Sequence, residues 1–187
     1  MRTKGDITVF SDGTMNVYNR SLAEELWYDY KDFVHRAAKY RKMNKKDAEL
    51  SARRYERAAV FALCEFFCQV LDSWYNQGQE KGCFPTGTGE DILFVFRTFA
   101  STALGAAESN VEDSEFSGLY SLLERYCRHN GSVWEVMTGD HLSKTEEKMD
   151  DFLTRVESRT SFRRFTPWSE QTKSIIERLS GLLRRRD

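Results

Sequence analysis

The chain has 187 residues, the size of one ordinary domain, because chains divide into several domains only beyond ~250 residues. Hydrophobic residues make up 40% of the sequence and aromatic residues 13%, which excludes an intrinsically disordered chain. The 28 basic and 29 acidic residues nearly cancel, which excludes the whole-protein positive field of polybasic nucleic-acid binders. We therefore expect one folded domain over residues 1–187, whose basic surfaces, if any, are local.

The compartment is predicted from the amino terminus and the cysteines. No run of apolar residues follows the first charges, so no secretory signal is expected, and the longest nearly apolar run, 58–71, is too short to span a membrane. Cys64 and Cys68 lie one helical turn apart in apolar surroundings, which favours free thiols in a reducing cytoplasm. A zinc site of these two with Cys127 and His129 is the weaker alternative, because neither pair has the usual spacing. We expect a cytoplasmic protein without membrane contact, metal or cofactor.

The first 18 residues differ in pattern from the rest. Two runs of alternating β-branched, aromatic and polar residues, 7–10 and 15–18, flank the pair Asp12 and Gly13. An Asp-Gly pair between such runs is a strong hairpin signal. The sequence predicts a short β-hairpin over residues 1–18.

Two long helices are predicted next. Ser21 and Glu24 form a capping box, and apolar residues then recur at helical spacing up to the basic turn 41–46. A second helix is expected over residues 47–76. From Ala58 this helix is apolar on every side, which is typical of a helix surrounded by others and predicts the centre of the fold.

The remaining chain has the caps and stops of further helices. We expect an all-α fold, a bundle of five or six helices, with a helical core over 21–165 and an amphipathic carboxy-terminal helix over 166–187. The core helices after the second are predicted from Thr88 to Glu108, from Phe116 to Asn130 and from Ser143, capped with Glu146, to Arg159.

Glu65 and Arg97 are each the only charge in an apolar run of a predicted helix. A buried charge without a partner costs several kcal/mol, so we predict that these two side chains form a structural ion pair in the core. A functional carboxylate at Glu65 is the alternative.

Basic residues are concentrated between Lys31 and Arg57, where ten face four acids. Tyrosines are interleaved with this basic pattern: Tyr28 and Tyr30 just before it, and Tyr40 and Tyr55 within it. This pattern is typical of side chains that contact nucleic-acid phosphates and bases, although an ordinary solvated helix face has the same composition. The candidate nucleic-acid-binding residues are Arg36, Lys39, Arg41, Lys42, Lys45, Lys46, Arg53, Arg54 and Arg57. Arginines between 155 and 164 and between 184 and 186 extend the basic pattern.

Arg125 and His129 are four residues apart on a predicted helix and would share one face. A histidine there can abstract a 2′-hydroxyl proton and an arginine can stabilise the charge on phosphorus, so the pair is a candidate catalytic site of a metal-independent ribonuclease. The alternative is that His129 complements the helix dipole.

Residues 51–76, SARRYERAAVFALCEFFCQVLDSWYN, resemble the long first helix of HEPN domains, the helical bundles of prokaryotic toxins and defence ribonucleases. The helix that ends near Arg125 and His129 lies where that family places its active-site Arg and His, although three residues separate the two here and the family spacing is longer. The resemblance implies a dimer that binds or processes RNA in a defence or toxin system.

Two functional hypotheses follow from the sequence. The first is a helical interaction module of HEPN-like type that binds or processes RNA, as a homo-oligomer. The second is a non-catalytic subunit that docks on a protein partner and has no nucleic-acid role.

Overall fold

The computed structural model describes residues 21–84, 91–105, 111–128 and 140–164, and the backbone of two four-residue strands, β1 (Asp6–Val9) and β2 (Met15–Tyr18). The strands pair antiparallel with Ile7 opposite Val17. The connecting turn and the strand side chains lie outside the described residues, so the hairpin stays a prediction. The predicted carboxy-terminal helix, 166–187, also lies outside them.

The described part of the chain is an all-α bundle, as predicted. It holds the long helices α1 (Leu22–Arg41) and α2 (Ala48–Glu80) and the later helices α3 (Ile92–Leu104), α4 (Ser117–Cys127) and α6 (Asp140–Arg159). A short 3-10 helix, η1 (Val111–Asp113), precedes α4. No helix in these described ranges has both the length and the apolar composition that crossing a membrane requires.

The helix ends follow local chemistry. The Ser21 hydroxyl accepts a hydrogen bond from the Glu24 amide at 3.2 Å and caps α1, as predicted. The α2 helix runs to Glu80, past the predicted end at residue 76. Gly78 lies inside it, where a Cβ would be 2.2 Å from the Phe84 ring. The Asp91 carboxylate caps α3 by accepting from the Leu93 amide at 3.1 Å, whereas the predicted cap, Thr88, lies outside the described residues.

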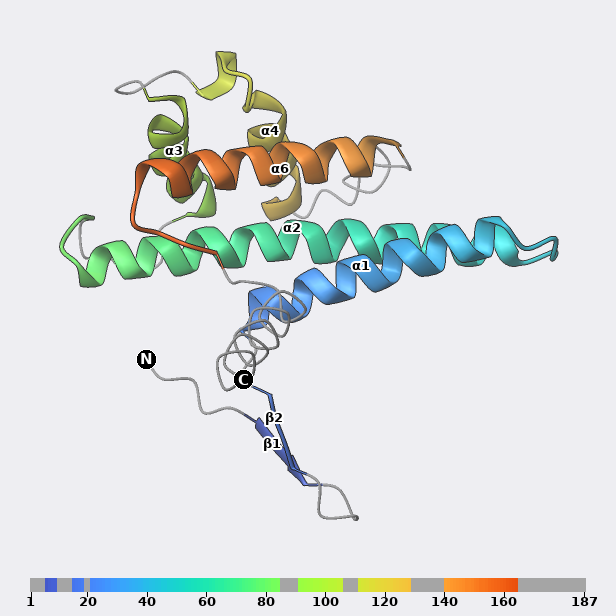
Figure 1. The fold of residues 1–187 in the computed structure, drawn as a ribbon. Helices are drawn as coiled ribbons and strands as arrows, with labels where there is room; N and C mark the ends of the chain where they lie inside the picture. Colours follow the sequence, from blue (N-terminus) through green and yellow to red (C-terminus); the bar gives the residue numbers. More distant parts are fainter. Residues whose placement is uncertain are drawn as a thin grey trace, which may run out of the picture.

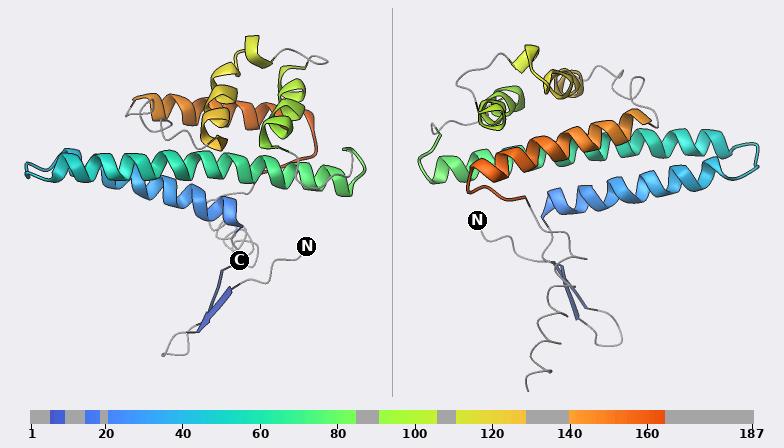
Figure 2. Two further views of the ribbon diagram at one scale, coloured as in Figure 1. Left: turned by 180° about the vertical axis from the view of Figure 1, so that it is seen from behind. Right: turned by 45° about the horizontal axis from the view of Figure 1, so that its top comes forward.

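Helix α2 lies in the middle of the bundle, with α1 along one side and α3, α4 and α6 on the other (Figures 1 and 2). The core forms where α2 meets this second group. Phe67 of α2, Phe96 of α3 and Phe152 of α6 are fully buried, and their ring centroids are 4.8 to 6.1 Å apart. The prediction that residues 58–71 of α2 are the centre of the fold is confirmed.

The α1–α2 hairpin extends beyond the rest of the molecule. Figure 1 shows the turn between the two helices projecting past the start of α6, and α1 packs mainly on α2. We call residues 31–57 the arm: the second half of α1, the turn, and the first part of α2. Towards its tip, α1 and α2 pack on each other.

Replacing Phe67 with Ala should lower the free energy of unfolding by ~3 to 5 kcal/mol, because a fully buried ring leaves a cavity. Phe61→Ala is the matched control, on the same helix but 46% exposed, and should cost about 1 kcal/mol or less. Chemical denaturation measures both. A loss below ~1 kcal/mol for Phe67→Ala would contradict the central position of α2.

Candidate nucleic-acid interface

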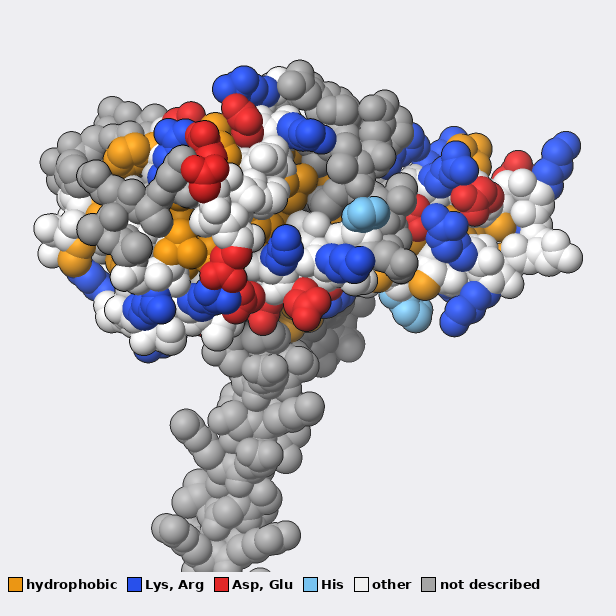
Figure 3. All heavy atoms as spheres, turned by 90° about the horizontal axis from the view of Figure 1, so that it is seen from above, with side chains coloured by type: hydrophobic (Ala, Val, Ile, Leu, Met, Phe, Trp, Pro, Cys, Tyr) orange, Lys and Arg blue, Asp and Glu red, His pale blue; other side chains and the backbone are white. Residues whose placement is uncertain are grey.

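The arm is a tight helical hairpin whose turn is held by backbone hydrogen bonds. The Met43 amide donates to the Tyr40 carbonyl at 3.0 Å as α1 ends, and the Ala48 amide donates to the Lys45 carbonyl at 3.0 Å as α2 begins. This places the basic run 41–46 at the projecting tip, where the sequence predicted a turn. Seen from above in Figure 3, Lys and Arg side chains gather at this end of the molecule, with a few acidic side chains among them.

Three of the candidate arginines are held by carboxylates within the arm. Arg36 Nε donates to Asp32 at 2.6 Å, Arg53 Nε donates to Glu49 at 3.0 Å, and Arg41 Nε donates to Glu56 at 2.8 Å. These hydrogen bonds raise the pKa of Arg36 and of Arg41, so both guanidinium groups stay charged. The guanidinium groups of these three arginines therefore already have a carboxylate partner inside the protein.

Five other candidate cations are different. Their side chains are exposed, and the described part of the chain provides none of these side chains with a hydrogen bond, an ion pair or a ring contact. These five, which we call the tip cations, are Lys39, Lys42, Lys45, Lys46 and Arg54. The last candidate, Arg57, is half-buried.

Of the four tyrosines interleaved with these cations, Tyr30, Tyr40 and Tyr55 pack against other side chains of the protein, and Tyr28 is half-buried. Tyr30 is buried, with 1% of its surface exposed. Tyr40 and Tyr55 stack on each other across the arm, with ring centroids 5.5 Å apart and planes 17° apart. Arg36 lies over the Tyr55 ring, with its guanidinium carbon 5.8 Å from the ring centroid. These rings pack the two helices of the arm together.

The base of the arm is anchored by two carboxylates that the sequence analysis did not single out as site residues. Glu56 lies on the buried stripe between Ala52 and Ala59. Its carboxylate can be buried there because it forms an ion pair with Arg41. Glu146 of α6 accepts a hydrogen bond from the Tyr30 hydroxyl at 2.6 Å and binds Lys31. Burial, and then this bond, raises the pKa of Tyr30 far above its ordinary value.

Glu146 was predicted to complete a cap with Ser143, and this is wrong. The α6 helix begins at Asp140, so Ser143 lies inside the helix, and the Glu146 side chain reaches α1 instead. A cavity of about 250 Å³ lies between α1, α2 and α6 at this point, and its walls include Ala37, Ala59 and Leu142.

The predicted ion pair between Glu65 and Arg97 does not form. Glu65 accepts hydrogen bonds from the Tyr126 hydroxyl at 2.7 Å and from Gln69 at 3.0 Å. Arg97 is 53% exposed at the edge of α3, where it binds Glu112 and the Tyr120 hydroxyl. A neutral phenol and an amide satisfy the half-buried carboxylate, and solvent satisfies much of the arginine.

The predicted catalytic pair is only partly described. The α4 helix ends at Cys127, with Arg128 as its cap, so it is shorter than predicted. Arg125 is exposed in the last turn of α4, and His129 lies outside the described residues. The ribonuclease site therefore stays a prediction.

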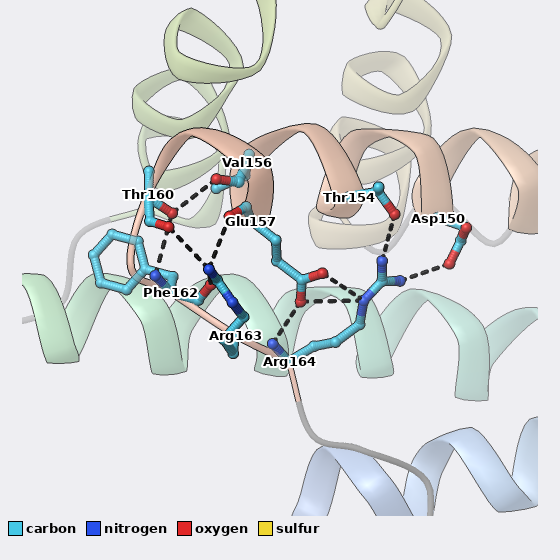
Figure 4. A network of polar contacts seen from close by, with 8 residues as sticks. All are labelled: Asp150, Thr154, Val156, Glu157, Thr160, Phe162, Arg163 and Arg164. Carbon is cyan, nitrogen blue, oxygen red and sulfur yellow. Dashed lines mark hydrogen bonds and ion pairs between the residues drawn. The ribbon is translucent and has the colours of Figure 1, made fainter. Parts of the chain in front are cut away.

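The arginines near the end of α6 are engaged in holding that end. Arg164 binds Asp150 at 2.6 Å, the Thr154 hydroxyl at 2.6 Å and Glu157 at 3.2 Å, and Arg163 donates to main-chain carbonyls, as Figure 4 shows. Arg155 binds Glu115 and Asp151, and Arg159 donates to the Thr102 and Ala103 carbonyls at the end of α3. This second basic group therefore stabilises the fold. The arginines of 184–186 lie outside the described residues.

The thiols lie in an apolar environment that suppresses their ionisation. Burial raises the pKa of Cys64 to about 12 and also raises the pKa of Cys68 and of Cys127. A cysteine binds a metal ion as the thiolate, and this apolar environment disfavours the thiolate. Within the described residues, no group of three or more His, Cys, Asp and Glu side chains is placed to hold a metal ion.

Comparisons of the chain with protein-family models, with curated proteins and with solved structures find no match. The HEPN resemblance therefore stays a prediction, and the function has to be argued from the geometry of the arm.

A double-mutant cycle tests the revised partner of Glu65. Glu65→Gln and Tyr126→Phe should be coupled by about 1 to 2 kcal/mol in unfolding free energy, because the first removes the charge of the acceptor and the second removes the donor of one charge-assisted hydrogen bond. Glu65→Gln and Arg97→Gln should be additive within ~0.5 kcal/mol. The reverse result, coupling to Arg97 and none to Tyr126, would restore the original ion-pair prediction.

Proposed function

We propose that the arm binds nucleic acid through the phosphates of its backbone. The observation that carries this proposal is the set of tip cations: five exposed, positively charged side chains without a partner in the described residues, on a part of the molecule that projects from the bundle. The arm as a whole has ten basic and four acidic residues, a net charge of +6 on a protein whose net charge is -1.

Three of the four acids of the arm face arginines, and the fourth, Asp47, is exposed next to Lys46, so the turn keeps an excess of positive charge. The acids Asp32, Glu49 and Glu56 lie beside arginines and neutralise them, while the lysines of the turn stay exposed and close together in sequence. Like charges gathered in one short turn repel one another, and bound phosphates relieve that repulsion. Each neutralised phosphate also releases condensed counterions, which favours binding.

The alternative, docking on a protein partner without nucleic acid, fits the tip less well. Lysine is depleted from the centres of protein interfaces, whereas exposed aromatic side chains are enriched there. The tip presents four lysines, and its tyrosines stack on each other. Leu50 is 51% exposed nearby, but a single exposed leucine is common on any protein surface.

The proposal concerns binding, and it includes no cleavage step, since His129 lies outside the described residues. A role in a prokaryotic defence or toxin system, and assembly as a homo-oligomer, rest on the HEPN resemblance alone.

Reversing two lysines of the turn tests the proposal. Lys45→Glu with Lys46→Glu should weaken binding to nucleic acid at least ~10-fold at low salt, and should flatten the dependence of log K on log salt by about 2, because two phosphate contacts are lost. Fluorescence anisotropy with labelled RNA and DNA measures both quantities.

The matched control reverses Lys144 and Lys148, two exposed lysines of α6. This variant has the same net charge as the first, so the proposal expects it to bind like the unmodified protein. Equal losses in both variants would indicate a general charge effect and contradict a site on the arm. If the unmodified protein binds no probe at ~50 mM salt, the nucleic-acid proposal fails and the protein-docking hypothesis takes its place.

A further inference from the structure

We infer that the arm prefers double-stranded over single-stranded nucleic acid and binds it without regard to base sequence, an inference that rests on the proposed function. It follows from which groups the arm leaves available to a ligand. Three kinds of contact are possible with nucleic acid: stacking on bases, hydrogen bonds to base edges, and contacts to phosphates.

The packing of the arm engages its tyrosine rings and so disfavours stacking on bases. Proteins that hold single strands stack successive bases on exposed aromatic side chains. In the arm, Tyr55 stacks on Tyr40, lies 6.3 Å from the Phe33 ring and has the Arg36 guanidinium 5.8 Å from its own ring centroid. Tyr30 is buried and donates its hydroxyl to Glu146. The rings that a single strand would need therefore serve the fold.

Base-edge recognition is limited for a related reason. Arginine is the side chain most often used to read guanine, because its planar fork makes two parallel hydrogen bonds. The forks of Arg36, Arg41 and Arg53 are held by carboxylates of the arm. Among the arginines of the arm, only Arg54 is exposed without a partner in the described residues. The other tip cations are lysines, which act as point charges and carry no planar pattern.

What is left is contact to phosphates, and phosphate contacts favour the duplex. A duplex carries one charge per ~1.7 Å of its axis, twice the linear density of one strand, and each contact releases more counterions from it. Lys39, Lys42, Lys45 and Lys46 all lie within eight residues around a single turn, so the four charges can contact only a short stretch of a nucleic acid. A compact group of cations meets more phosphates on the denser polymer.

The test compares duplexes and single strands on the full chain. Labelled probes of ~20 nucleotides are needed in two unrelated sequences, each as a blunt duplex and as single strands that do not self-pair, in RNA and in DNA. Anisotropy titrations at ~100 mM salt should give duplex affinities at least ~5-fold above those of the single strands, with the two sequences equal within ~2-fold and with a steeper salt dependence for the duplex.

Two charge-reversal variants show whether the arm makes the contacts to the probes. Lys45→Glu with Lys46→Glu should lower duplex affinity more than single-strand affinity, and the Lys144 and Lys148 reversal should change neither; circular dichroism verifies that each variant is folded. Single strands that bind as tightly as duplexes would overturn this inference and leave the proposed function standing. Strong preference for one duplex sequence would overturn the sequence independence. Absence of binding to every probe would overturn the proposed function itself.

Discussion

The length of α2 is the constraint on which the rest of the structure depends. This helix has 33 residues, about 50 Å at 1.5 Å per residue, whereas α1 and α6 have 20 residues each. The second half of α2 is covered by α3, α4 and α6 and forms the aromatic core around Phe67. Its first half extends beyond these helices and packs on α1 (Figure 1). The arm exists because one helix is longer than the bundle that buries it.

This geometry explains the two kinds of side chain found on the arm. Between its helices, small and aromatic residues pack together, with Ala37 and Ala52 buried and Tyr40 stacked on Tyr55. The outward sides of the arm meet water and are charged. Ion pairs such as Arg41 with Glu56 link the two helices, whereas the lysines of the turn form no ion pair in the described part of the chain. The first set of charges serves the fold, and the second set is available to a ligand.

Much of the fold was predictable because its signals are local. The absence of Gly and Pro between Ser21 and Gln77, the cap at Ser21 and the basic turn define α1 and α2 closely, and the all-round apolar run identified the central helix. The partners of charged side chains were not predictable in the same way. An isolated acid in an apolar run shows that Glu65 needs a hydrogen-bond donor, but a phenol on α4 serves as well as an arginine, and only the packing of the helices selects Tyr126. For the same reason, sequence could place tyrosines near the basic residues but could not show that Tyr40 and Tyr55 face each other.

The central claim, that the lysines of the turn are the ones that contact nucleic acid, is tested most directly by lysine acetylation of the unmodified protein followed by mass spectrometry, with and without a duplex. The account predicts that the duplex protects Lys39, Lys42, Lys45 and Lys46, while Lys81, Lys144 and Lys148 keep the reactivity they have in the free protein. Protection of the α6 lysines with no change at the turn would contradict it.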